Sequence, residues 1–257
     1  MNILDFSHRE LLAELTLREI KQRYKQSVLG YAWVILNPLC QMLVMAFVFS
    51  KIIQTSQIGV PYAIFLYVGL LPWTFFSNAL ISSTNSLVGN AGLITKIYFP
   101  REIFVLSTIL AKMVDFFLSS TVLILFLYLF RIHITWYILW FFPIFLIQLI
   151  FTYGLSLLLA AFNLFYRDIQ YVLNLGLIVW MYLTPVIYPI EILPKQYQII
   201  FQLNPMAVLF NAYRKVILGD GAPNLVSLAV ALAVSLIIYG LGITIFKRLE
   251  GVFADVV

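Results

Sequence analysis

Six long apolar runs, separated by short polar loops, occupy most of this 257-residue chain. Hydrophobic residues make up 63% of the sequence and charged residues only 11%, whereas a soluble domain carries about 25% charged residues. A helix needs about 20 apolar residues to cross a bilayer core about 30 Å thick. The pattern predicts an all-α integral membrane protein, because no water-soluble fold of this length could bury so many apolar side chains.

The apolar runs and the loop charges together predict the topology. Ten of the 16 Lys and Arg residues lie in the N-terminal segment, the second and fourth loops and the C-terminus, while five lie in the remaining loops. Since cytosolic loops are enriched in Lys and Arg, both termini are predicted to be cytosolic. This enrichment also accounts for the net charge of +5 without a nucleic-acid partner. The expected transmembrane helices are Tyr31–Ile53, Tyr62–Leu87, Phe104–Phe130, Trp136–Leu164, Ile169–Tyr188 and Leu225–Phe246.

The first 30 residues are predicted to form two amphipathic helices outside the membrane domain, which is expected to cover residues 31–257. Ser7 with Glu10, and Thr16 with Glu19, match the capping-box pattern at two successive helix starts. A bend near Thr16 is expected, because the apolar stripes before and after it point in different directions. The second helix has a basic face suited to anionic lipid, formed by Arg18, Lys21, Arg23 and Lys25. The segment is either a membrane anchor or a docking element for a cytosolic partner.

The second loop, between the second and third runs, is predicted to hold a short cytosolic helix at about residues 89–99, ended by Pro100. Tyr98 and Phe99 lie near its tip. Two adjacent aromatic side chains suit insertion into a groove on another protein, but they also suit the aromatic belt of a membrane interface. Both interpretations remain open at this point.

The segment from Pro189 to Asn224 is too apolar for a solvated loop. Asn204 is placed to cap a helix with Pro205 at its first position, and Gly219 suits the position after its end. A second short helix is expected near Lys195–Leu203. Two helices too short to span predict a re-entrant or interfacial hairpin, which either gates an outer mouth or covers it without gating.

Motifs for catalysis are absent from the sequence. There is no Gly-rich P-loop, no serine-hydrolase elbow and no zinc-protease motif, and His8 and His133 are isolated. The 11 acidic residues are scattered. We therefore expect no catalytic residue and no metal site on this chain.

Lys112 and Asp115 lie within the third apolar run, three residues apart. This spacing places them on one helix face, where they can form an ion pair. Ionisable groups inside a bilayer often mark functional sites. The pair is either a structural bridge within the helix bundle or a contact for a phosphate group.

Several segments together resemble the permeases of polysaccharide ABC exporters, the type-2 exporters of O-antigen, capsule and teichoic-acid polymers. The first are Leu17–Trp33 (LREIKQRYKQSVLGYAW) and Leu36–Leu39 (LNPL). The others are Lys96–Glu102 (KIYFPRE), Phe165–Ile169 (FYRDI), Leu183–Pro189 (LTPVIYP), Asn204–Met206 (NPM) and Tyr213–Gly219 (YRKVILG). They cover nearly the whole chain, and the combination in this order is more specific than any one motif.

The resemblance implies a homodimeric permease in the bacterial inner membrane, joined to two separately encoded subunits that bind ATP and Mg²⁺. The substrate would be a lipid-pyrophosphate-linked polysaccharide. The 89–99 helix becomes a coupling helix, and the 189–224 hairpin becomes an outer gate. The coupling contacts would be Lys96, Ile97, Tyr98, Phe99 and Arg101.

The resemblance also implies that the first and fifth spans line a channel. The candidate lining residues are Tyr31, Trp33, Trp180, Tyr182 and Tyr188, although Trp and Tyr also populate membrane interfaces. The cations nearest the cytosolic entrance, which could contact a pyrophosphate, are Arg23, Lys25 and Arg101; lipid headgroups attract the same residues.

Three other functions remain to be distinguished. A type-2 ABC permease for a lipid or a drug would share most of these features. A secondary transporter should show midplane acids and internal repeats, and a glycolipid transferase should show clustered acids or a metal site. Transport driven by an ion gradient without ATP would identify the secondary transporter.

Overall fold

The computed structural model describes residues 6–25, 27–50, 60–95, 99–190, 194, 201, 204–219 and 221–256. Every regular element in these ranges is helical. Five stretches are long and apolar enough to cross a membrane: α2 (Ala32–Phe49), α3 (Tyr62–Thr84), α6 (Glu102–Leu129), η2 with α7 (Trp136–Phe165) and α11 (Leu225–Glu250). They match five of the six predicted spans, with ends that differ by a few residues.

The fifth predicted span differs. Helix α8 covers Ile169–Tyr182 and is followed by turns, so the helix ends six residues before Tyr188. Its 14 residues rise only about 21 Å. Pro185 explains the early end, because proline lacks an N–H and disfavours helical geometry at the preceding residue, Thr184.

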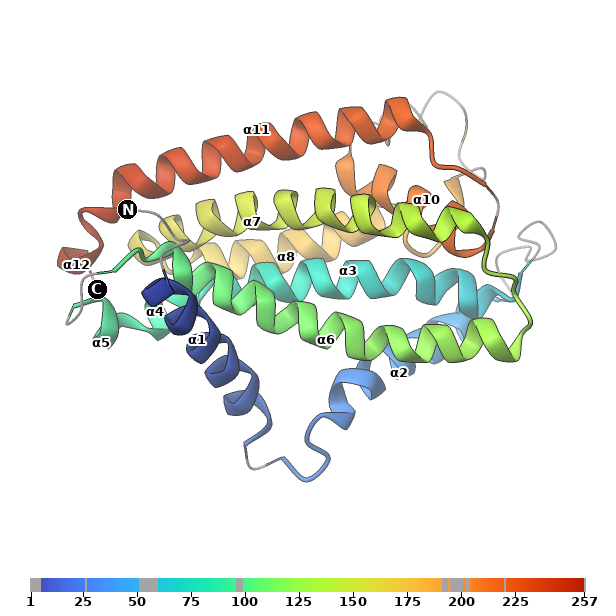
Figure 1. Cartoon of the computed structure of the whole chain (residues 1–257), viewed down its shortest axis with the longest axis horizontal. Coiled ribbons are helices and arrows are strands. Elements are labelled where there is room, and N and C mark those ends of the chain that lie inside the picture. Colours follow the sequence, from blue (N-terminus) through green and yellow to red (C-terminus); the bar gives the residue numbers. More distant parts are fainter. Residues whose placement is uncertain are drawn as a thin grey trace.

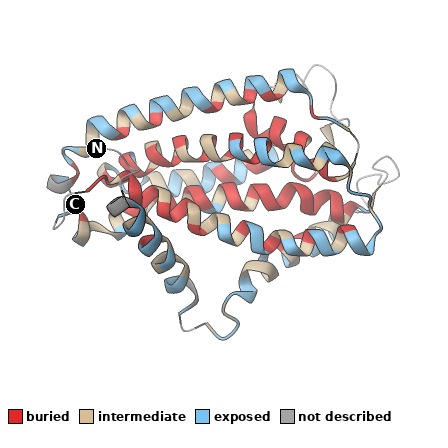
Figure 2. Ribbon diagram, viewed as in Figure 1, coloured by how far each residue is buried: buried red, intermediate tan, exposed pale blue. Residues whose placement is uncertain are grey.

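The long helices lie roughly side by side around α3 (Figure 1). Helix α3 packs against α2, α6, α7, α8 and the outer helix α10 (Pro205–Ile217), and Figure 2 shows that it is buried along most of its length. Helix α11 packs mainly along α7. The end of α1 and the start of α2 project from the bundle, so that the two helices form a V (Figure 1).

The N-terminal prediction of two helices is wrong, because α1 runs without a break from Phe6 to Tyr24. The Thr16 hydroxyl donates to the carbonyl oxygen of Leu12 at 2.7 Å, so it serves the middle of one helix instead of capping a second. Leu15 is buried, and α1 packs on α6 through its apolar stripe.

The structure has two short helices where a single helix over residues 89–99 was predicted. Two single turns, α4 (Ser86–Gly89) and α5 (Ala91–Ile94), meet at Asn90. The Asn90 side-chain amide donates to the carbonyl oxygen of Ser86 at 2.8 Å. Phe99 follows in non-helical backbone. Lys96, Ile97 and Tyr98 lie outside the described residues.

The segment from Pro189 to Asn224 contains the helix that was predicted to begin after Asn204. In α10, the Asn204 side chain accepts from the Met206 N–H at 3.1 Å, Pro205 is the first helical residue, and Gly219 has a φ of +85° just beyond the end. The Tyr213 hydroxyl donates to Gln148 at 2.8 Å, and the Gln148 amide donates to the Pro72 carbonyl oxygen at 2.8 Å. This chain of hydrogen bonds ties α10 through α7 to α3. The hairpin's other expected helix, near Lys195–Leu203, falls almost entirely outside the described residues.

Helices α7 and α11 approach each other most closely at two glycines. A Cβ on Gly154 would lie 2.6 Å from the Tyr239 Cα, and a Cβ on Gly242 would collide with the Gly154 carbonyl oxygen. Small residues allow this close backbone approach, which is a main source of helix association in lipid.

The Gly242→Ala substitution should therefore destabilise the protein by about 1–3 kcal/mol, because the added methyl group forces the two backbones apart. Gly240→Ala is the matched control, since its Cβ meets nothing within 4 Å on the same helix. Thermal unfolding of both variants in detergent provides the measurement. Equal unfolding temperatures for the two variants would contradict the proposed packing.

Candidate functional site

A polar cleft lies between α2, α3 and α6, within the membrane-spanning part of the bundle. Its volume of about 450 Å³ falls in the range of ligand pockets, about 300–1,000 Å³. Lys112 is about 15 Å along α6 from Glu102, well inside a 28-residue helix that is long and apolar enough to cross a membrane. Polar surface at this depth needs an explanation, because lipid cannot hydrogen-bond with it.

The polar side chains reach the cleft in three stripes, one on each helix. Their spacing of three or four residues puts the members of each stripe on one helix face. The stripes are Asn37 and Gln41 on α2, Thr74, Ser77 and Asn78 on α3, and Lys112, Asp115 and Ser119 on α6. Apart from Lys112 and Asp115, these residues were not among the predicted site residues, although polar residues at helical spacing within an apolar run would have revealed them.

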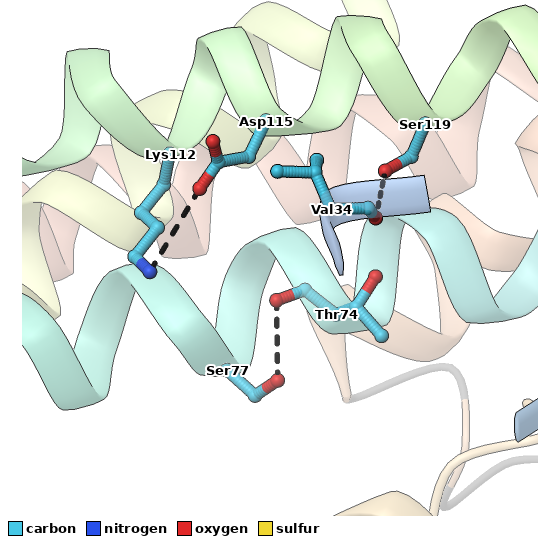
Figure 3. Close-up of polar contacts among 6 residues, drawn as sticks. All are labelled: Val34, Thr74, Ser77, Lys112, Asp115 and Ser119. Carbon is cyan, nitrogen blue, oxygen red and sulfur yellow. Dashed lines mark hydrogen bonds and ion pairs between the residues drawn. The ribbon is translucent and has the colours of Figure 1, made fainter. Parts of the chain in front are cut away.

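The predicted Lys112–Asp115 pair forms in the structure. Lys112 Nζ lies 3.9 Å from an Asp115 carboxylate oxygen, and the two side chains are only 14% and 19% exposed. Figure 3 shows Lys112 extending from α6 toward α3 with Asp115 beside it. Among the residues that line the cleft, these two are the only charged ones, so the lining has no net charge.

Hydrogen bonds hold the walls of the cleft in place. The Ser119 hydroxyl donates to the Val34 carbonyl oxygen at 2.8 Å and joins α6 to α2 (Figure 3). The Thr74 hydroxyl donates to the Leu71 carbonyl oxygen at 2.9 Å, and the Ser77 hydroxyl donates to the Trp73 carbonyl oxygen at 2.9 Å. These hydroxyls keep their oxygen lone pairs as acceptors.

The side-chain amides of the cleft, unlike its hydroxyl groups, make no hydrogen bonds within the described chain. Asn37, Gln41 and Asn78 are exposed, and none of their side chains makes a hydrogen bond with the described part of the chain. Trp33 lies one turn before Asn37 and is 47% exposed. The cleft thus presents unpaired amide groups and an open indole to whatever lies beside it.

At the end of the bundle where α1 begins, two contacts tie the short helices and α11 together. An Arg18 nitrogen donates to the Asn90 side-chain oxygen, which joins α1 to the α4–α5 junction. The Arg101 backbone N–H donates to the Glu250 carboxylate at 2.9 Å, and its guanidinium donates to the Glu250 carbonyl oxygen. Phe99 is buried with its ring edge-on to Phe104, 5.2 Å between centroids.

The described part of the structure does not bring the predicted pyrophosphate contacts together. Arg101 is bound to the end of α11, and Lys25 is exposed just past the other end of α1, which runs away from the bundle (Figure 1). The side chain of Arg23 lies outside the described part of the chain.

The predicted channel aromatics divide into two groups. Tyr31, Trp33 and Tyr182 are exposed, at 48%, 47% and 58%. Trp180 packs edge-on to Phe76, 5.2 Å between centroids, inside the bundle. The Tyr188 hydroxyl donates to the Tyr182 carbonyl oxygen at 3.0 Å.

Arg214 lies on α10, within the segment predicted to form a hairpin, and it is a buried anchor. Its guanidinium donates to the carbonyl oxygens of Pro185 and Val186, each at 2.5 Å, and lies 3.7 Å over the Phe65 ring. A Cβ on Gly69 would come within 2.8 Å of it. Arg214 therefore holds α10 against the turn that follows α8.

Comparison with known proteins identifies the family. A family model described as "ABC-2 type transporter" matches residues 10–218. The chain belongs to the ABC-2 type transporter family.

Relatives of this ABC-2 permease match it from end to end. It is 34% identical to the O-antigen export system permease protein RfbA of Klebsiella pneumoniae, over 96% of this chain and 95% of the relative. It is 31% identical to the protein of the same name from Myxococcus xanthus, over 97% and 96%. It is 25% identical to the polysialic acid transport protein KpsM of Escherichia coli, over 92% of both chains.

As a permease, this chain needs no reacting groups of its own, and its site should be judged by binding and packing. Among the described residues, no group of three or more His, Cys, Asp or Glu side chains is placed to hold a metal ion. The intramembrane ion pair is therefore best tested first for its structural contribution.

We expect Lys112→Met and Asp115→Leu to destabilise the protein by about 3–5 kcal/mol each, because each removes one partner of a mostly buried ion pair and leaves the opposite charge behind. The double variant should lose less than either single variant, since it removes both charges. The yield and unfolding temperature of the three proteins in detergent measure this, with Thr121→Val on the same helix as control. Additive losses in the double variant would show that the two groups do not stabilise each other.

Proposed function

We propose that this chain is the membrane half of an ATP-driven exporter that moves a lipid-pyrophosphate-linked, O-antigen-like polysaccharide out of the cytosol across the bacterial inner membrane. The observation that carries the proposal is the similarity to an O-antigen export permease along nearly the whole chain, at 34% identity over 96% of its residues. The more distant match to a polysialic acid transport protein extends over nearly the same length.

ATP and Mg²⁺ are assigned to two separate ATP-binding subunits, because the sequence contains no P-loop of its own. The contact with them is formed by α1, α5 and the segment Lys96–Tyr98. The Arg18–Asn90 contact supports this assignment, since it makes α1 and the α4–α5 junction move together. Phe99 packs on α6 and Arg101 binds the end of α11, so these two residues are not assigned to the contact with the partner.

Two copies of the chain form the channel. The described face of α8 is largely open, with exposed side chains at Tyr171, Leu175, Ile178 and Tyr182 in steps of three and four residues. Helix α2 offers a similar open face, and both helices pack on α3. Tyr31, Trp33 and Tyr182 face the polymer, while Trp180 and Tyr188 position the end of α8.

The remaining topology follows from this assembly. Helix α8 and the turns after it serve as the fifth of six spans, and both termini lie in the cytosol in accordance with the loop charges. Helix α10 forms the outer gate, and Arg214 connects it to the end of α8. Arg23 and Lys25 are the cations that meet the pyrophosphate.

The ATPase assignment predicts which proteins co-purify with a tagged chain. A P-loop ATPase should elute in equal amount from gently solubilised native membranes, and the complex should hydrolyse ATP. Mass spectrometry of the eluate and a phosphate-release assay are the measurements. Recovery of the chain without any ATPase, under conditions that preserve other membrane complexes, would refute the proposal.

In the proposed dimer, the α8 helices of the two copies lie close together. In a Cys40→Ser background, Leu175→Cys should give a cross-linked product near twice the 29.5 kDa of one chain, because Leu175 is 66% exposed on the open face of α8. Leu236→Cys, at 50% exposure on α11, is the matched control. Gel electrophoresis after treating membranes with a short bismaleimide reads out the product. Equal cross-linking at both positions would argue against an α8 seam.

A further inference from the structure

We propose that the cleft between α2, α3 and α6 binds the sugar units of the polymer during passage, so that the glycan pathway includes α3 and α6 as well as the channel helices. This inference rests on the proposed export function. It assigns binding roles to Trp33, Asn37, Asn78 and Thr74.

The unpaired amides carry the inference. An amide in contact with lipid tails loses its hydrogen bonds to water and gains none, at a cost of several kcal/mol in an apolar medium. Asn37, Gln41 and Asn78 are exposed at this depth and make no hydrogen bond within the described chain. Their hydrogen-bonding partner therefore lies outside the described chain, and in this proposal it is a ligand rich in hydrogen-bonding groups.

The charge of the cleft selects between an anionic and a neutral ligand. Lys112 is neutralised by Asp115 at 3.9 Å, and no other cation lines the cleft. A phosphate would need uncompensated positive charge, as guanidinium or ammonium donors provide at phosphate sites. A neutral, hydroxyl-rich molecule instead needs both donors and acceptors, which the amides, the hydroxyl oxygens and the ion pair supply together.

The aromatic wall favours sugar rings in particular. Trp33 is 47% exposed at the rim and lies on the same face of α2 as Asn37, one turn away. The flat C–H face of a pyranose packs on an aromatic ring, while its hydroxyl groups point outward to polar partners. Trp33 and the two asparagines thus offer one apolar and two polar contacts to a single ring.

Photo-crosslinking tests the contact directly. In cells whose surface polysaccharide depends on this chain, p-benzoylphenylalanine replaces Asn78, and a control chain carries it at Thr121, which is exposed on α6 outside the cleft. With a radioactive sugar as label, position 78 should form a glycosidase-sensitive adduct of chain and polymer, and position 121 should not. A dimer adduct, a phospholipid adduct or no adduct at position 78 would overturn the proposal.

Substitutions give a second, independent test. Asn37→Leu with Asn78→Leu should lower polymer export about tenfold by removing two hydrogen-bonding groups. ATPase association and the amount of folded complex should stay unchanged, because neither amide pairs with another residue in the described part of the chain. Asn37→Leu with Asn78→Gln should export more polymer than the double leucine variant, because glutamine keeps the amide group.

A matched pair of threonines controls for changes in helix packing. The Thr74 and Thr121 hydroxyls both donate to the carbonyl oxygen three residues earlier, at 2.9 and 2.7 Å, but only Thr74 lines the cleft. Thr74→Val should reduce export and Thr121→Val should not; equal effects would overturn the proposal.

The outcomes separate this inference from the export function. If deletion of the chain leaves surface polysaccharide unchanged, the export function itself fails. If the wild-type chain restores export and the cleft variants restore it equally well, only the cleft proposal fails.

Discussion

Helices in a bilayer gain no hydrophobic free energy by packing together, so their association depends on close contact and on hydrogen bonds between them. Helix α3 shows how this chain meets that constraint. It is buried along most of its length (Figure 2), and polar ties fasten it at several levels. The Tyr62 hydroxyl donates to Ile187 at 2.7 Å, Gln148 donates to Pro72, and Ser83 donates to Ser156 at 2.8 Å. Helices α2, α6, α7, α8 and α10 all pack on this one element.

The same constraint separates structural polar groups from functional ones. Tyr213, Gln148 and Arg214 are buried in the bundle and donate to other parts of it, and they join α10 to the core. Asn37 and Asn78 line the cleft with exposed side chains and have no such partners in the described chain. In a protein that conducts a polar polymer through lipid, groups of the second kind are the ones expected to contact it.

The polar ties also suggest how motion could pass across the membrane. Arg18 links α1 to the α4–α5 junction, and Arg101 links the start of α6 to the end of α11. Arg214 links α10 to the turn after α8 at the opposite end of the bundle. A push on the short helices would therefore be carried by connected helices as rigid bodies.

Local signals were enough to predict five of the spans and the cap of α10, because apolar run length and the Asn204–Pro205 pair act within one segment. The Lys112–Asp115 pair was predictable for the same reason. The continuous α1 was not, because the same Thr16 side chain can cap a new helix or bond back within an existing one, and packing against α6 decides between them. Phe99 was assigned to a partner protein, yet the structure buries it on Phe104.

The sequence by itself determined that this chain lies in a membrane, where most of its helices cross, and which family its motifs resemble. Those properties depend on composition and on residues close together in the chain. Only the tertiary structure decided that stripes on α2, α3 and α6 meet in one cleft, that Arg214 is buried over Phe65, and that Arg101 binds Glu250. These contacts join residues far apart in sequence, and which faces meet depends on helix packing that no single segment encodes.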